Sequence, residues 1–260
     1  MGLRLASNGK TRKRCRTCGP EVGGQRKNQS CKGAESCYGM AGSFRMCNGD
    51  CNNMDKKVAI ARIVQCAKLY DSNLKDCNML FMCMDKHKNI KVVEVEFKET
   101  YFLHMTGVKA PNGGELRAGA FYNRAISNRL SEHDFELAAD STTEQKLKVL
   151  PTLMSRNLGV ASMSGDYDVL RPRLYTEKLA GGVRACMGFV KDEKSGYYVP
   201  NTVLNEDIRH FVSRTDRIIL TYRKSKGDTC YQEIVYAAKK IDWKKIRLPK
   251  GYEDLPLPSK

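Results

Sequence analysis

The chain has 260 residues, of which 41% are hydrophobic, and this is enough for one sizeable domain with a packed core. Lys and Arg outnumber Asp and Glu by 45 to 29, and the net charge of +16 favours a polyanionic partner, nucleic acid before an anionic membrane surface. A simpler alternative is that the charge only keeps the protein soluble. No run reaches the ~18 apolar residues of a membrane span, and no secretory signal opens the chain, so we expect a cytoplasmic protein without a membrane partner.

Residues 1–53 differ in composition from the rest. Six of the eleven cysteines fall here, among Gly, Asn, Ser and Arg and without apolar periodicity, so we expect a disordered leader. A zinc module is a weak alternative, because only one closely spaced cysteine pair is present. Its candidate ligands are Cys15, Cys18, Cys31 and Cys37. Since Met54 resembles an ordinary protein start, we favour a fused leader over a zinc module.

From residue 54 the pattern indicates a compact α+β domain. "KKVAIARIVQCAKLYDSNL" has apolar residues at helical spacing. "NMLFMCMDKHKNIKVVEVEF" predicts two strands around a polar turn at residues 85–89. In the second strand Val93, Val95 and Phe97 share the apolar face. We therefore expect a helix followed by an antiparallel hairpin.

"FLHMTGV", residues 102–108, is predicted to be the end of a strand. On a strand, residues i and i+2 point to the same side, so His104 and Thr106 would face the same space. They would then form either a buried polar pair or half of an active site. His104 is also the histidine with the most apolar neighbours in the sequence.

After the loop "KAPNGGEL", helical spacing resumes over residues 118–130. A second helix is predicted in 141–159, capped by Ser141, Thr142 or Thr143 and kinked or broken by Pro151. Short strands follow around "VASMSGDY", "RACMGFVKD" and "YYVPN", then a short helix from Thr202.

"RIILTYRK" and "CYQEIVYAA" predict a closing hairpin. Residues 241–260 are expected to be an extended, partly disordered tail. The predicted fold is α+β, with helices packed on one side of an antiparallel sheet, and the predicted domain spans residues 54–240.

Motifs for several chemistries are missing from the sequence. It has no Gly-x-Ser-x-Gly nucleophile motif, no phosphate-binding loop and no His-x-x-x-His metal motif. What remains is acid-base chemistry with cationic support and no cofactor. RNA is the matching substrate, because its 2′-hydroxyl can attack the neighbouring phosphate if a base, an acid and positive charge are at hand.

Five segments, taken in order, carry a resemblance to a known family. "YFLHMTGV", "AFYNRAISNRLS", "TEQKLKVLPTLM", "YYVPNTVLNEDIR" and "CYQEIVYAA" resemble a phage and prophage group of the barnase, EndoU, colicin E5/D and RelE nuclease superfamily. The similarity covers about residues 55–240. It implies a BECR-like fold and a predicted RNase, often a toxin or phage effector.

The resemblance also implies roles for single residues. The matched catalytic positions are His104, Thr106, Lys146 and Thr202, where Thr202 replaces a common Ser. His104 would be a general base or acid, Thr106 would bind a phosphate oxygen, and Lys146 would neutralise developing charge. Further candidates are Arg209 for phosphate binding and Tyr231 for base stacking or proton transfer.

Each of these residues also has a simpler interpretation. His104 is as well explained as a buried, hydrogen-bonded core histidine. Lys146 would be a solvated helix residue, Arg209 would pair with Glu206 or Asp207, and Tyr231 would cover the sheet.

Two functional hypotheses follow from the sequence. The first is a metal-independent endoribonuclease of phage or toxin type, held in check by an antitoxin or immunity protein. The second is a non-catalytic nucleic-acid-binding or regulatory phage protein. They differ in geometry, because the nuclease requires the four catalytic candidates to meet in one open, positively charged cleft.

Overall fold

The computed structural model describes residues 54–111, 114–168, 170 and 174–258. The predicted leader and its candidate zinc ligands lie outside these residues. Helix α1 (Lys56–Asn73) begins at Asp55, whose carboxylate accepts a hydrogen bond from the Lys57 amide at 3.3 Å. The other helical segments are η1 (Glu99–Tyr101), α2 (Phe102–Thr106), α3 (Ala118–Ile126), α4 (Thr142–Leu153), η2 (Ile208–His210) and η3 (Trp243–Lys245).

The three predicted long helices are confirmed as α1, α3 and α4. Pro151 does not break α4, which continues to Leu153. The proline lies in the last turn, so its missing N–H removes a hydrogen bond only where the helix is about to end.

The strands form one mixed sheet of eight. They are β1 (Cys77–Met84), β2 (Ile90–Phe97), β3 (Met163–Asp166), β4 (Lys178–Gly181), β5 (Cys186–Lys191), β6 (Tyr198–Leu204), β7 (Asp216–Ser225) and β8 (Glu233–Ala237). Their order is β1-β2-β6-β5-β4-β3-β7-β8, and β7 pairs with β1 as well. The strands from β1 to β7 therefore close into a ring with an inner and an outer side.

The predicted α+β class is confirmed, and the strand pairs are antiparallel except for β2 and β6. The predicted hairpins are confirmed as β1–β2 and β7–β8. The helix expected to begin at Thr202 is wrong. Thr202 lies in β6, where it pairs with Gly188 of β5, and the helical turn comes later, at Ile208–His210. Strand β4 was not predicted.

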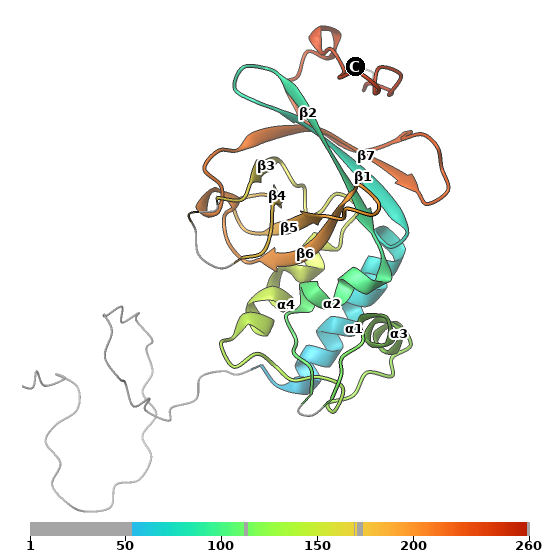
Figure 1. Ribbon diagram of the computed structural model, residues 1–260, viewed down its shortest axis with the longest axis vertical. Coiled ribbons are helices and arrows are strands. Elements are labelled where there is room, and N and C mark those ends of the chain that lie inside the picture. Colours follow the sequence, from blue (N-terminus) through green and yellow to red (C-terminus); the bar gives the residue numbers. More distant parts are fainter. Residues whose placement is uncertain (1–53, 112–113, 169, 171–173, 259–260) are drawn as a thin grey trace, which may run out of the picture. The chain divides into compact units, whose positions relative to one another are not determined.

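Helices α1, α2, α3 and α4 gather on one side of the sheet (Figure 1), as predicted. Between them lies the helix-side core, where the rings of Tyr70, Phe102 and Tyr122 pack against one another and against the inner side of the strands. Inward-facing strand residues such as Phe81 and Val95 belong to the same core. Strands β1, β2, β5 and β6 thereby each bury residues against the helices.

The outer side of β1 and β7 is covered by the C-terminal segment, whose apolar residues pack on Leu80, Met82 and Tyr222. The Tyr222 hydroxyl also donates a hydrogen bond to the Pro256 carbonyl at 2.9 Å. The prediction that this segment is partly disordered is therefore wrong for the residues up to 258, which the structure describes. Its apolar residues, spaced between prolines and charges, have too little periodicity to be recognised as a core contribution.

Candidate functional site

The segment "FLHMTGV" forms the short helix α2, not the end of a strand. Successive helical residues are about 100° apart, so His104 and Thr106 point to nearly opposite sides. His104 is exposed and Thr106 is fully buried. The predicted shared face is therefore wrong, and the cause is that a short apolar run has no periodicity to separate helix from strand.

Thr106 closes helix α2. Its hydroxyl donates to the Leu103 carbonyl at 2.7 Å and accepts from the Val108 amide at 3.4 Å. The hydroxyl thus satisfies backbone groups that the helix end leaves without partners. In this geometry Thr106 has no surface with which to contact a phosphate.

Gly107 lets helix α4 approach α2. It has a φ of 73°, and a Cβ built on it would lie 2.8 Å from Cδ of Lys146. The Thr143 hydroxyl, at the start of α4, donates to the Gly107 carbonyl at 2.8 Å and accepts from the Ala138 amide at 3.0 Å. These contacts hold Lys146 against the end of α2.

Lys146 and His104 are the two predicted catalytic residues that the structure brings together. The Lys146 ammonium donates to the His104 carbonyl oxygen at 3.1 Å. Burial lowers the pKa of Lys146 to about 8. Among the ion pairs of the described residues none includes Lys146, so its charge is not neutralised by a carboxylate there.

Thr202 does not join this pair. Its methyl group would lie 2.7 Å from a Cβ built on Gly188, its partner on β5, so the two residues share a face of the sheet. The next residue, Val203, packs into the helix-side core. Because neighbours on a strand alternate in direction, Thr202 faces away from α4.

Arg209 and Tyr231 also lie apart from His104. The Arg209 guanidinium makes bidentate hydrogen bonds to the Asp207 carboxylate, with Nη2 at 2.6 Å from Oδ2. These bonds lower the pKa of Asp207 to about 2. Tyr231 is buried in the core under the C-terminal segment, and burial raises the pKa of its phenol well above the ordinary value. The simpler interpretations of both residues therefore match the structure.

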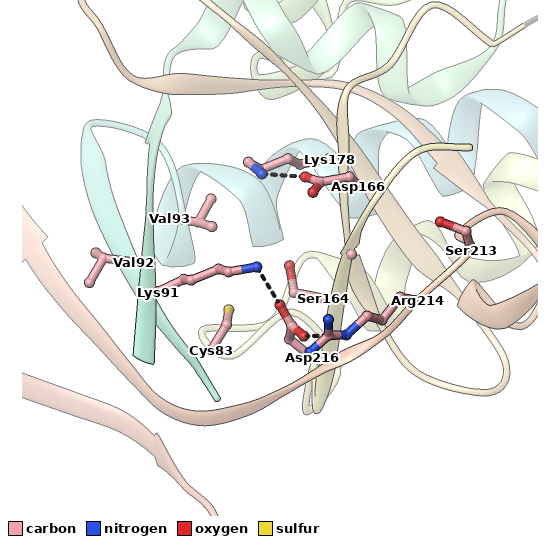
Figure 2. A pocket seen from close by; sticks show the side chains of 11 residues that line it. Cys83, Lys91, Val92, Val93, Ser164, Asp166, Lys178, Ser213, Arg214 and Asp216 are labelled. Atoms are coloured by element: carbon pink, nitrogen blue, oxygen red, sulfur yellow. Dashed lines mark hydrogen bonds and ion pairs between the residues drawn. The ribbon is translucent and has the colours of Figure 1, made fainter. Parts of the chain in front are cut away.

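A different group of polar side chains lines a pocket of about 340 Å³ on the inner side of the strand ring (Figure 2), which we call the mouth pocket. Its wall consists of Cys83, Lys91, Val92, Val93, Ser164, Gly165, Asp166, Lys178, Ser213, Arg214 and Asp216. Cys83 and Val93 also belong to the helix-side core, so the pocket begins where that core ends. Three cations and two carboxylates meet here from strands β2, β3, β4, β7 and the segment before β7.

The mouth pocket contains two separate ionic groups. Lys178 pairs with Asp166, and its ammonium lies 5.5 Å from the centre of the Tyr198 ring. Burial lowers the pKa of Lys178, but the hydrogen bond to Asp166 and the negative charge of that carboxylate together more than offset this and leave the pKa raised. On the other side Lys91 and Arg214 approach Asp216.

Sequence comparison identifies the family. Residues 62–240 match the profile of the family described as phage-Barnase-EndoU-ColicinE5/D-RelE like nuclease4. The chain belongs to this phage BECR-like nuclease family. No curated protein and no solved structure matches the chain. In the described part of this nuclease-family chain, no helix is long and apolar enough to cross a membrane.

The mouth pocket was missed by sequence reasoning, although one signal pointed to it. Lys91 lies two residues before Val93 on the apolar face of β2, where a charged side chain is unexpected. The other polar groups are brought to it by pairing between distant strands. The lysine that interrupts the apolar face of β2 was therefore the sequence signal for a polar pocket.

Cys83 is the one thiol in this pocket, and burial raises its pKa to about 12. A thiol with such a pKa is almost entirely protonated at neutral pH, so it is not a nucleophile. The mouth pocket thus offers cations, carboxylates and hydroxyls. The α2–α4 junction offers an imidazole and an ammonium.

Proposed function

We propose that the protein is a metal-independent endoribonuclease that uses the His104–Lys146 pair. Membership of a nuclease family supports cleavage of a nucleic acid. The choice of RNA rests on the chemistry, because the available groups suit attack by a 2′-hydroxyl, which DNA lacks.

The observation that carries the proposal is that the exposed His104 lies beside Lys146, whose ammonium donates to the His104 backbone carbonyl and has no carboxylate partner among the described residues. Lys146 uses one of its three N–H donors on the His104 carbonyl, which leaves two for a ligand. The pair therefore combines an imidazole, which has ring nitrogens that can accept or donate a proton, with an ammonium.

In the proposed reaction a ring nitrogen of His104 takes the proton of the 2′-hydroxyl. The 2′-oxygen attacks the phosphorus, the bond to the 5′-oxygen breaks, and that oxygen takes a proton from the medium. The products are a 2′,3′-cyclic phosphate and a free 5′-hydroxyl. The Lys146 ammonium stabilises the extra negative charge of the phosphorane.

The test is incubation of the purified full chain with total RNA in the presence of EDTA. We expect RNA fragments that end in 2′,3′-cyclic phosphate. His104→Ala should remove the cleavage, since general acid-base groups contribute about 10²–10⁴-fold. His87→Ala is the matched control, because His87 is an exposed histidine in the β1–β2 turn.

Loss of cleavage in both histidine variants, or in neither, would contradict the role of His104. Binding of RNA without cleavage by the parent protein would favour the alternative, a non-catalytic nucleic-acid-binding or regulatory phage protein. That binding should weaken with added salt.

An RNase of this kind endangers the cell that makes it. We therefore propose action in the cytoplasm and a neutralising antitoxin or immunity protein. Expression of the parent chain should stop growth, while the His104→Ala variant should be tolerated. Equal toxicity of the two would argue against an RNase as the toxic activity.

A further inference from the structure

Four of the five charged residues of the mouth pocket lie on strands, and the fifth, Arg214, lies in the segment just before β7. Lys91 lies on β2, Asp166 on β3, Lys178 on β4 and Asp216 on β7. Their positions are fixed by the hydrogen-bonded ladders β3–β4 and β3–β7, where Asp166 pairs with Lys178 and Ser164 pairs with Asp216. A site on such a frame is ordered before a ligand arrives, which lowers the entropic cost of binding.

Two of the cations, Lys91 and Arg214, make only long contacts to carboxylates. The Lys91 ammonium lies 3.5 Å from Oδ2 of Asp216, and the Arg214 Nε lies 3.7 Å from Oδ1. The Arg214 Nη2 also lies 3.5 Å from Oδ2 of Asp85. These distances exceed those of a good hydrogen bond, so most N–H groups of the two cations are available to an anion.

Asp216, in contrast, has a carboxylate oxygen that lacks a hydrogen-bond donor among the described residues. Its Oδ1 is buried and accepts no hydrogen bond from the described residues. A buried carboxylate oxygen without a donor is costly, so a ligand that donates to it would gain free energy. The pocket thus has a carboxylate between two cations that approach it only to 3.5 and 3.7 Å (Figure 2).

A ligand that fits must combine an anionic group with a hydroxyl or N–H donor. Inorganic phosphate has the charge but is small for a pocket of about 340 Å³. A nucleotide has the charge on its phosphate and donors on its ribose, and carboxylates commonly accept from ribose hydroxyls. The preference for a nucleotide over other phosphorylated molecules rests on the proposed function.

We propose that the mouth pocket binds one ribonucleotide, with the phosphate on Lys91 and Arg214 and a ribose hydroxyl donating to Asp216. The Lys178–Asp166 pair forms the opposite wall. No residue of this pocket belongs to α2 or α4, so it is a binding site separate from the His104–Lys146 pair. It gives the nuclease a place to hold one nucleotide of an RNA strand.

The experiment is calorimetric titration of the full chain with nucleoside 3′- and 5′-monophosphates, their 2′-deoxy counterparts and inorganic phosphate. We expect a ribonucleotide to bind at least about tenfold more tightly than its 2′-deoxy counterpart, because a buried carboxylate then loses its donor. It should also bind more tightly than phosphate. Equal affinity of phosphate and nucleotides, or of ribose and deoxyribose forms, would overturn the proposal.

Variants locate the binding. Lys91→Gln should weaken nucleotide binding about fivefold to tenfold, while Lys68→Gln, at an exposed position of α1, should not. The Lys91 side chain is 59% exposed, so its replacement should leave the fold intact. Asp216→Asn should reduce the preference for ribose; if it unfolds, Lys91→Gln still decides. Unchanged binding by Lys91→Gln would overturn the site.

The outcome is distinguishable from that of the proposed function. His104→Ala should bind nucleotides as the parent does while it loses cleavage. Cleavage by a protein that binds no nucleotide in the mouth pocket would overturn the pocket alone. Nucleotide binding by a parent protein that does not cleave RNA would overturn the nuclease and leave the pocket standing.

Discussion

Lys146 links the burial of one side chain to the pH dependence of the proposed reaction. Because burial lowers its pKa to about 8, the ammonium is lost as the pH rises through that value. Cleavage should therefore fall above about pH 8, by up to about tenfold per pH unit. Lys146→Arg keeps its charge at high pH, so its rate should not fall there.

The measurement is the initial rate between about pH 6.5 and 9.5, with His104→Ala as the blank for alkaline hydrolysis of RNA. An unchanged pH profile in Lys146→Arg would show that another group titrates. A Lys146→Arg variant that is inactive at every pH would show that Lys146 must transfer a proton and not only supply charge.

Thr106 is the residue whose expected role the structure changes most. Its hydroxyl closes α2, so Thr106→Val should lower the free energy of unfolding by about 1–2 kcal/mol. Cleavage per folded molecule should stay the same, because the side chain is fully buried. Urea unfolding and a single-turnover assay test the two statements. A stable but inactive Thr106→Val protein would return the residue to the active site.

At the level of elements, Gly107 decides how closely α2 and α4 approach. Gly107→Ala forces a residue with a Cβ into a φ of 73° and brings that Cβ to 2.8 Å from Lys146 and 3.3 Å from the Thr143 backbone. The backbone conformation alone costs about 1–2 kcal/mol. Gly196→Ala, with a φ of 75° and open space around it, measures that part by itself.

Urea unfolding should show a larger loss of stability for Gly107→Ala than for Gly196→Ala, and cleavage should fall only in the former because Lys146 is displaced. Equal losses in the two variants would mean that the side chain of Lys146 moves aside freely. The α2–α4 junction would then be looser than its contacts indicate.

Elements with a clear period were predictable, and short ones were not. The alternation of Val93, Val95 and Phe97 with charged residues predicted β2, and apolar residues at helical spacing predicted α1. Residues 102–108 and the segment from Thr202 have too few residues for a period. Their structure is decided by tertiary contacts, such as the approach of α4 to Gly107.

The same limit applied to the candidate site. His104 and Lys146 were found through a family resemblance, and they meet because Thr143 fixes the start of α4. The mouth pocket required knowledge of strand order, since Lys91, Lys178 and Asp216 come from three separate strands. Only Lys91 left a trace in the sequence, as a charge on an apolar face.

At the level of the whole molecule, the C-terminal segment completes the fold. The family match ends at residue 240, yet Trp243, Ile246 and neighbouring apolar residues cover the outer side of β1 and β7. A chain that ends at Lys240 would expose Leu80, Met82 and Tyr222. It should melt at a clearly lower temperature or aggregate. A truncated chain as stable as the parent would show that the segment is a passive cover.

Tyr222→Phe, which removes only the hydrogen bond to Pro256, should lower the free energy of unfolding by about 1 kcal/mol.

The net charge of +16 leads to a prediction about salt and about the first 53 residues. Those residues contain ten of the 45 basic side chains, but none of the proposed site residues. If they contact RNA, a chain that starts at Met54 should bind RNA more weakly and with a shallower dependence on salt, by about 0.7 in the log–log slope for each phosphate that they neutralise. Cleavage positions should stay the same, because all the proposed site residues remain. Filter binding at several salt concentrations and mapping of the cut sites test this. Identical slopes would restrict the RNA contacts to the folded domain, and altered cut sites would assign part of the specificity to residues 1–53.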